Sequence, residues 1–263
     1  MGEFDILKYP RTQHLQGSRL QKGDEDLSQI PFSYIKDRHL VIEEKIDGAN
    51  TAISFNDKGE LLLQSRGHYL TGGNREKHYN LFKQWAMIHK DKLYSVLGTR
   101  YIMYGEWLYA KHTVYYDLLP HYFIEFDIYD RQEKYFLDTI SRYNLIKDLP
   151  VVSAKVLASG KFNKLEDILK YLGNSNYISS NHIDNLRNEA IKLNLDPDKI
   201  QRETDSSMLM EGLYIKIEEN GRVVDRMKYV RFSFLQTVEL SESHWLSRPI
   251  VPNKLDKDIN DLF

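Results

Sequence analysis

The chain has 263 residues, a formal net charge of −2, a hydrophobic fraction of 41% and a charged fraction of 28%. This composition is typical of a soluble globular protein with one large domain or two small ones, and it excludes binding of nucleic acid by bulk positive charge. The absence of cysteine excludes disulfides, thiolate metal sites and cysteine nucleophiles. No apolar run suggests a secretory signal or approaches the roughly 20 residues of a membrane span, so we expect a cytoplasmic protein with no membrane partner.

The first part of the chain predicts a β-meander followed by a helix. Residues 39–46, 50–55 and 60–66 are rich in aliphatic and β-branched residues and are separated by turn signals, which is typical of consecutive strands. In residues 77–97, apolar side chains recur at i, i+4 and i+7, which predicts one amphipathic helix.

The remainder mixes further strands and helices. Aromatic and β-branched residues at 101–109 and 121–130 predict two strands, and Asp138 or Thr139 can cap a helix that ends before Pro150. Apolar stripes predict helices near 165–172 and 183–193.

The last predicted strands form a hairpin. Residues 208–219 and 222–231 flank Asn220-Gly221, a strong hairpin signal. Because the strands come in antiparallel runs instead of alternating with helices, we predict an α+β fold. The chain contains no glycine-rich phosphate loop, so a bound nucleotide would have its phosphates held by side chains.

One segment suggests covalent chemistry. Glu44-Lys45-Ile46-Asp47-Gly48-Ala49-Asn50 contains the pattern K-x-D-G between two predicted strands. This pattern alone is weak, because an Asp-Gly turn with Lys45 pointing to solvent explains it equally well.

Further motifs follow in a fixed order, on or at the ends of predicted strands. They are Ser65-Arg66-Gly67, Tyr104-Gly105-Glu106, Phe123-Ile124-Glu125-Phe126-Asp127, Glu211-Gly212-Leu213-Tyr214-Ile215-Lys216 and Arg226-Met227-Lys228. Over residues 40–231 this set resembles the six motifs of the covalent lysyl nucleotidyltransferases, which include ATP-dependent ligases and RNA capping enzymes, and it is most similar to the RNA ligase 2 family. Within the motifs, the sequence departs from the family pattern at the arginine of R-x-K, where lysine is usual at both positions.

The resemblance implies a ligase-type nucleotidyltransferase (adenylyltransferase) domain in which antiparallel sheets flank a nucleotide cleft, with ATP and Mg²⁺ or Mn²⁺ as cofactors. Lys45 would attack ATP and form lysyl-AMP. Since a lysine must be neutral to attack, a cationic surround that lowers its pKa is expected. Lys216, Arg226 and Lys228 are the candidates and would also neutralise the triphosphate, although they could equally form solvated basic strand faces. Strand alternation places Arg226 and Lys228 on one face but leaves the facing of Lys216 open.

Carboxylates are required for the metal. Mg²⁺ prefers oxygen ligands, and Glu211 and Asp47 are the predicted pair, with a simple turn as the alternative for Asp47. Glu106 would hold the ribose hydroxyls or orient Lys45, and its alternative is a salt bridge at a strand edge.

The other candidates contact the nucleotide. By resemblance, Phe126 stacks on adenine and Glu44 reads it, although Glu44 alternates away from Lys45 and a lone Phe in a strand is commonly a core residue. Arg66 could reach the ribose or the 5′-phosphate of an acceptor strand. Asn50 could hold the leaving pyrophosphate, or it could serve only the turn.

These motifs predict an ATP-dependent RNA ligase that acts on RNA 5′-phosphate and 3′-OH ends, nicked duplex included. The alternatives are a DNA ligase or GTP-using capping enzyme of the same fold, or a non-catalytic protein that binds nucleic-acid ends. We expect a single nucleotidyltransferase domain over residues 1–263. It would comprise an N-terminal arm (1–38), a core (39–231) and an extension (232–263) without an OB-fold or other full C-terminal domain, so that a protein partner or a separate module could complete it.

Overall fold

The computed structural model describes residues 6–20, 28–240 and 248–263, so parts of the predicted arm and extension lie outside the described residues. The strands are β1 (Gln13–Leu15), β2 (Gln29–Ile30), β3 (Leu40–Lys45), β4 (Ala49–Phe55), β5 (Leu61–Ser65), β6 (Tyr101–Trp107), β7 (Phe123–Asp130), β8 (Tyr135–Leu137), β9 (Val152–Ser153), β10 (Val156–Gly160), β11 (Gly212–Glu219) and β12 (Arg222–Val230). The helices are α1 (Phe32–Ile35), η1 (Asn74–Tyr79), α2 (Asn80–Ile88), α3 (Lys90–Leu97), α4 (Thr139–Ile146), α5 (Leu165–Leu169), α6 (His182–Lys192), α7 (Pro197–Arg202), α8 (Phe232–Leu240) and η3 (Ile259–Leu262).

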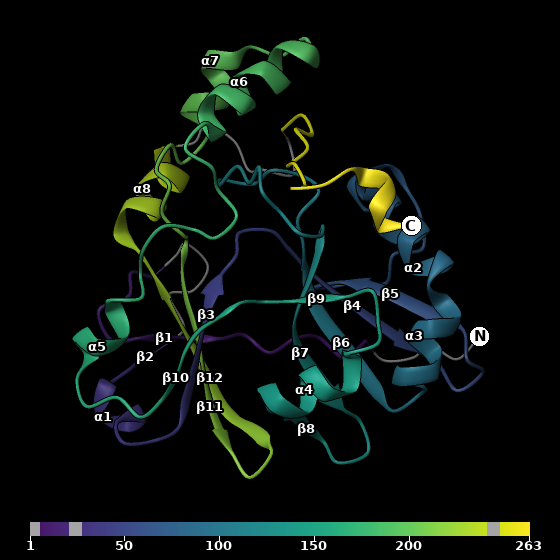
Figure 1. Cartoon of the computed structure of the whole chain (residues 1–263), viewed down its shortest axis with the longest axis vertical. Coiled ribbons are helices and arrows are strands. Elements are labelled where there is room, and N and C mark those ends of the chain that lie inside the picture. Colours follow the sequence, from purple (N-terminus) through teal and green to yellow (C-terminus); the bar gives the residue numbers. More distant parts are fainter. Residues whose placement is uncertain (1–5, 21–27, 241–247) are drawn as a thin grey trace.

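The described strands form one continuous sheet with two arms (Figure 1). One arm has the order β10-β3-β11-β12, the other has the order β7-β6-β4-β5, and β8 joins them. Neighbouring strands along this path are antiparallel. The α+β fold predicted from the sequence is therefore confirmed.

Local sequence signals account for several elements. The β11–β12 hairpin turns at Asn220 and Gly221, whose φ angles of 54° and 78° are those of the predicted tight turn. Helix α4 begins as predicted, because the Asp138 carboxylate accepts a hydrogen bond of 2.8 Å from the Ser141 amide. The single helix expected over 77–97 is wrong: a 3₁₀ turn comes first, and the helix is divided at His89.

Each arm has an apolar outer face covered by helices. Trp85 and Phe82 of α2 pack with Ile53 and Met103 of the β4–β6 strands. On the other arm, Ile42, Ile215 and Met227 pack with Ile168 of α5 and Ile35 of α1 in a separate core. The inner faces carry the motif side chains together with a smaller aromatic cluster that includes Tyr9, Tyr104 and Phe136.

Strand register brings the basic residues to the inner face. Lys45 of β3 lies opposite Gly212 of β11, Lys216 lies opposite Arg226, and Lys228 lies opposite Tyr214. Residues directly opposite one another in antiparallel strands point to the same face, so the register settles the facing of Lys216.

The described part of the N-terminal arm is integrated into the fold. Strand β1 pairs in parallel with β12, and Tyr9, His14 and Leu15 are buried. Residues in this segment therefore contribute to the inner face, which the sequence did not predict.

Candidate active site

Lys45 ends strand β3 at the inner face and is held by Glu211. Both carboxylate oxygens of Glu211 lie 2.8 Å from the Lys45 Nζ. Glu211 immediately precedes β11, and because Gly212 is opposite Lys45 in the register, the two side chains are neighbours. The Lys45 side chain keeps 24% of its surface exposed while that of Glu211 keeps 3%, so the amine remains accessible and its partner does not.

The other arm presents Glu106 to this pair. Asn50 of β4 lies opposite Glu106 of β6, and the turn that follows Lys45 packs directly on this strand. A Cβ on Gly48 would lie 2.5 Å from Leu108 Cδ2 and 2.8 Å from Glu106 Cγ. Only glycine fits this close approach, which explains the glycine of K-x-D-G by packing.

The electrostatics around Lys45 are acidic. Desolvation raises the pKa of Glu106 to about 8 and that of Glu211 to about 7; neighbouring carboxylates add to both shifts and Lys45 opposes them. Burial alone would lower the pKa of Lys45, but Glu211, Glu106 and Asp47 together raise it. The expected cationic surround that lowers this pKa is therefore not what this structure has.

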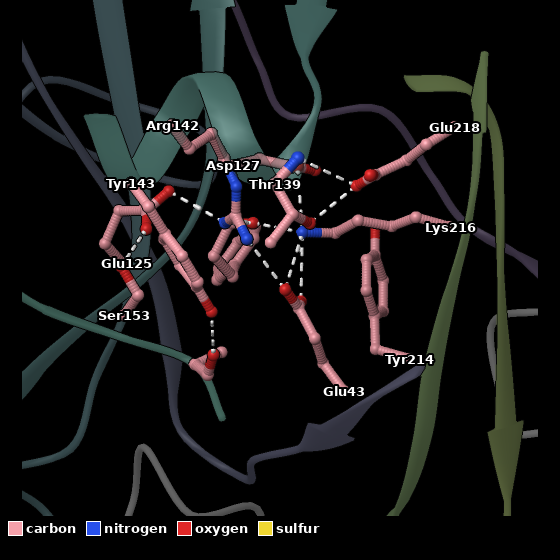
Figure 2. A network of polar contacts seen from close by, with 12 residues as sticks. Glu43, Glu125, Asp127, Thr139, Arg142, Tyr143, Ser153, Tyr214, Lys216 and Glu218 are labelled. Carbon is pink, nitrogen blue, oxygen red and sulfur yellow. Dashed lines mark hydrogen bonds and ion pairs between the residues drawn. The ribbon is translucent and has the colours of Figure 1, made fainter. Parts of the chain in front are cut away.

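Of the three cations predicted to surround Lys45, Lys228 is the one that the structure places by this pair. Lys228 lies close enough to Glu211 for its positive charge to oppose part of the rise in the pKa of this carboxyl. Lys216 is fully buried elsewhere, in what we call the interior ion cluster, formed by Glu43, Glu125, Asp127, Arg142 and Lys216 (Figure 2).

The interior ion cluster ties the two arms together. The Lys216 Nζ lies 2.9 Å from Glu43 Oε2 and 3.1 Å from Asp127 Oδ1. Arg142 of α4 bridges Glu43 at 2.7 Å and Glu125 at 2.9 Å. The structure places the Lys216 charge in this cluster and not beside Lys45, so this arrangement lends no support to the predicted contact with the cofactor phosphates.

Arg226 is also directed away from Lys45. Its Nε lies 3.9 Å from Asp127 Oδ2, and its guanidinium lies 3.8 Å from the centre of the Phe136 ring. These contacts lend no support to the predicted position of Arg226 beside Lys45, and its catalytic role stays a prediction.

Phe126 lies at a β-bulge on the inner face. Tyr104 of β6 is opposite Asp127 and Gly105 is opposite Glu125, so Phe126 is an extra residue and the expected side-chain alternation fails there. Its partly exposed ring packs edge-to-face on Tyr9, with ring centroids 5.1 Å apart.

Tyr9 is a residue that the sequence analysis missed. Its buried hydroxyl donates to Asp127 and shares a hydrogen bond with Tyr214, joining the two arms. A lone tyrosine in a polar segment gives no sequence signal for this position.

Asp47 anchors a loop. Its Oδ2 accepts hydrogen bonds from the Thr113 and Val114 amides at 2.7 and 2.8 Å, and its own amide donates to the Tyr116 hydroxyl at 2.8 Å. In this structure the Asp47 Oδ2 holds the segment that follows β6, and its role as a metal ligand stays a prediction. Within the described ranges, no group of three His, Asp or Glu side chains is placed to hold a metal by itself.

Glu44 faces the opposite side of β3. Its buried carboxylate accepts hydrogen bonds from the Ser175 Oγ at 2.5 Å and the Asn176 Nδ2 at 2.7 Å. A side-chain contact between Glu44 and an adenine on the inner face is thus excluded in this conformation. Arg66 follows β5 and is exposed, near the end of the strand pair that carries Asn50.

Comparisons with known proteins relate this site and fold to one family. A family model described as RNA ligase matches residues 38–230. No curated protein sequence matches the chain. Within the described residues, no helix combines the length and apolar character that a membrane span requires.

Solved structures of an RNA ligase from Naegleria gruberi share the fold. A variant with ATP and Mn superposes with a TM-score of 0.54 at 14% identity over 89% of this chain and 59% of that one. A variant with AMP and Mn gives 0.56 at 14% identity over 89% and 59%. The same ligase with PPi gives 0.52 at 17% identity over 89% and 58%. The chain thus spans about three fifths of the length of these ligases.

Proposed function

Because this chain belongs to the RNA ligase family, we propose that it is an ATP-dependent RNA ligase in which Lys45 forms lysyl-AMP. The observation that supports this most directly is the accessible Lys45 amine, held by both oxygens of the buried Glu211 and faced by Glu106 from the other arm. A lysine that served only the turn would have no need of two desolvated carboxylates.

The reaction begins at the Lys45 Nζ. The amine attacks the α-phosphorus of ATP; the P–N bond forms as the bond to the β-phosphate oxygen breaks, and pyrophosphate leaves. The carboxylates around Lys45 raise its pKa and keep it protonated in the free protein. Loss of that proton must therefore accompany nucleotide binding.

The carboxylates around Lys45 fit a divalent cation whose coordination the substrate phosphates would complete. Glu211 is the proposed ligand: burial raises the pKa of this carboxyl to about 7, and a bound cation would stabilise its ionised form. Mg²⁺ in nucleotide sites typically takes one or two carboxylates and the substrate phosphates, which agrees with the lack of an all-protein cage among the described residues. When bound, the cation would neutralise Glu211, lower the pKa of Lys45 and screen the phosphates. Mn²⁺ accompanies ATP in the Naegleria ligase.

The remaining inner-face side chains would position the nucleotide. We assign adenine stacking to Phe126, the ribose hydroxyls to Glu106 and phosphate charge to Lys228. We assign contact with the leaving pyrophosphate to Asn50, which lies opposite Glu106, and contact with an acceptor 5′-phosphate to the exposed Arg66.

The later steps join RNA ends. The 5′-phosphate of one RNA end attacks lysyl-AMP, which frees Lys45, and a 3′-OH then displaces AMP as the phosphodiester forms. Since the chain matches about three fifths of the Naegleria ligase, a partner or further module in strand joining is part of the proposal. A cytoplasmic location remains a prediction from composition.

Adenylation is tested with α-labelled ATP and Mn²⁺, followed by denaturing gels. We expect acid-labile label on the wild type, none on Lys45→Ala, and full labelling of Lys58→Ala, which removes an exposed lysine in the β4–β5 turn. Purified protein is first checked by mass for bound AMP, since pre-adenylated enzyme takes no label. An unmodified mass together with no labelling would refute the enzyme assignment.

Substrate choice is tested separately. Labelling from α-labelled GTP would favour a capping-type enzyme. Nicked duplexes with RNA or DNA at the 3′-OH strand distinguish an RNA ligase, which we expect, from a DNA ligase.

A further inference from the structure

A C-terminal segment is built into the loop that follows β6. Residues 248–263 are here called the C-terminal strap (Figure 1, yellow); their central part, residues 251–256, pairs with residues 109–119. The Lys111 amide donates to the Val251 carbonyl at 2.8 Å, and the Asp256 amide donates to the Leu119 carbonyl at 2.9 Å. The strap thus satisfies the backbone on both limbs of a mostly buried loop.

Asn253 is the centre of this contact and is 1% exposed. Its Nδ2 donates to the Leu108 carbonyl at 2.7 Å, and its Oδ1 accepts from the Tyr116 amide at 2.9 Å. Its backbone carbonyl accepts from the Tyr122 hydroxyl at 2.8 Å. Leu108 is two residues beyond Glu106, so Asn253 fixes the exit of the strand that carries Glu106.

Tyr116 passes this constraint on to the turn beside Lys45. Its amide is held by Asn253, while its hydroxyl accepts the amide of Asp47. The Asp47 carboxylate in turn binds the Thr113 and Val114 amides of the same loop. Two hydrogen-bonded steps therefore link Asn253 to the turn that immediately follows Lys45.

We propose that Asn253 is a positioning residue for lysine adenylation, holding Tyr116, and through it the Asp47 turn, so that Lys45 faces Glu106 and Glu211. The proposal rests on the function proposed above. Asn253 contacts neither Lys45 nor its carboxylates among the described interactions, so its effect is on geometry. Misplacement of a reacting group by about 1 Å can lower a rate about 100-fold.

The strap has other anchors, so loss of the Asn253 side chain leaves the segment docked. Val251 is 2% exposed and packs with Tyr115 and Leu186, and Leu262 is 4% exposed, with its carbonyl 3.1 Å from His89 Nε2. We therefore expect Asn253→Ala to fold.

The test is single-turnover adenylation at increasing concentrations of α-labelled ATP with Mn²⁺, on the whole chain. We expect Asn253→Ala to lower the maximal rate about 10- to 100-fold, with the half-saturating ATP concentration nearly unchanged. Asn253→Asp, which keeps an acceptor for the Tyr116 amide, should recover part of the rate. Lys254→Ala, which removes an adjacent side chain that pairs with Glu189 at 3.5 Å, should match the wild type.

Tyr116→Phe provides an independent variant. It removes the hydroxyl that accepts from Asp47, and its loss should not add to that of Asn253→Ala in the double variant, since both act along one path. A maximal rate within twofold of wild type for Asn253→Ala, even with a lowered melting temperature, would overturn the inference, as would additive losses. A wild type that takes no label would instead overturn the proposed function, and this inference with it.

Discussion

Replacing Lys216 by methionine separates two explanations of a basic residue in the motif E-G-L-Y-I-K. If Lys216 binds ATP, as the sequence predicted, the variant folds normally and binds ATP weakly. If its charge serves the interior ion cluster, the variant loses stability. The structure favours the second outcome, because the fully buried Lys216 Nζ forms ion pairs with both Glu43, at 2.9 Å, and Asp127, at 3.1 Å.

The size of the effect follows from burial. Glu43 and Asp127 are both buried and would each lose a cation, keeping Arg142 and Arg226 as their other basic neighbours. Removing one partner of a buried ion pair typically costs about 3–5 kcal/mol. This is a large part of the roughly 5–15 kcal/mol by which a domain is stable.

Urea denaturation followed by tryptophan fluorescence measures this change in the free energy of unfolding. With a slope of about 3 kcal/mol/M, the midpoint should fall by about 1 M or more. Arg187→Ala is the matched control, because its ion pair with Asp198 at 2.7 Å is largely exposed and should contribute less than about 1 kcal/mol. An unchanged midpoint for Lys216→Met, with weakened ATP binding, would refute the structural explanation.

Three further predictions follow from the described contacts. Desolvation raises the pKa of Glu106 from 4.5 to about 8, so between these pH values the folded chain retains a proton that the unfolded chain releases. The wild type should therefore lose stability relative to Glu106→Gln as the pH rises from 5 to 8. A difference in melting temperature between the two proteins that does not change with pH would contradict this. Glu211 is the proposed Mn²⁺ ligand and would bind the cation only when ionised. Because burial raises the pKa of Glu211 to about 7, Mn²⁺ should raise the melting temperature more at pH 8 than at pH 6, an effect that Glu211→Gln should abolish. Gly48→Ala should lower the free energy of unfolding by about 1–3 kcal/mol through overpacking against β6, and it should slow adenylation. Gly173→Ala, which has open space around it, should be near neutral in the same denaturation assay. Equal urea midpoints for the two variants would count against the close approach at Gly48.

The motif-bearing strands could be predicted because each is a run of β-branched and aromatic residues bounded by turn signals. Motif identity then indicated Lys45, Glu106 and Glu211, and the structure brings these three together across the two arms. The grouping of strands into antiparallel runs, without regular alternation with helices, also sufficed for the fold class.

Charge partners could not be predicted, because they depend on contacts between distant segments. Lys216, Arg226 and Lys228 are equivalent in a sequence read by type and spacing. Lys216 becomes a buried cation because it contacts Glu43 and Asp127, and Arg142 joins the same cluster; these three residues lie on β3, β7 and α4.

Local irregularities of the strands and loops could not be predicted from the sequence for a related reason. Period-two alternation assumes an uninterrupted ladder, and the bulge at Phe126 breaks it. Asp47 fitted both a turn and a metal site by its motif, and the motif gave no signal for the contacts of its carboxylate with the Thr113 and Val114 amides. Tyr9 and Asn253 belong to no recognisable sequence motif, so their contacts become evident only in the folded chain.

The pairing of β3 with β11 also constrains when activity can appear. Lys45 and Glu211 are 166 residues apart in sequence, and the Glu43–Arg142 contact spans 99. Contacts of such separation form late, since a long loop must close before they are made. A chain still emerging from the ribosome would have its proposed nucleophile, Lys45, on β3 long before the strand that completes the surroundings of this lysine is synthesised. Lysine labelling during translation should therefore lag behind the synthesis of β11, which makes adenylation a sensitive reporter of complete folding.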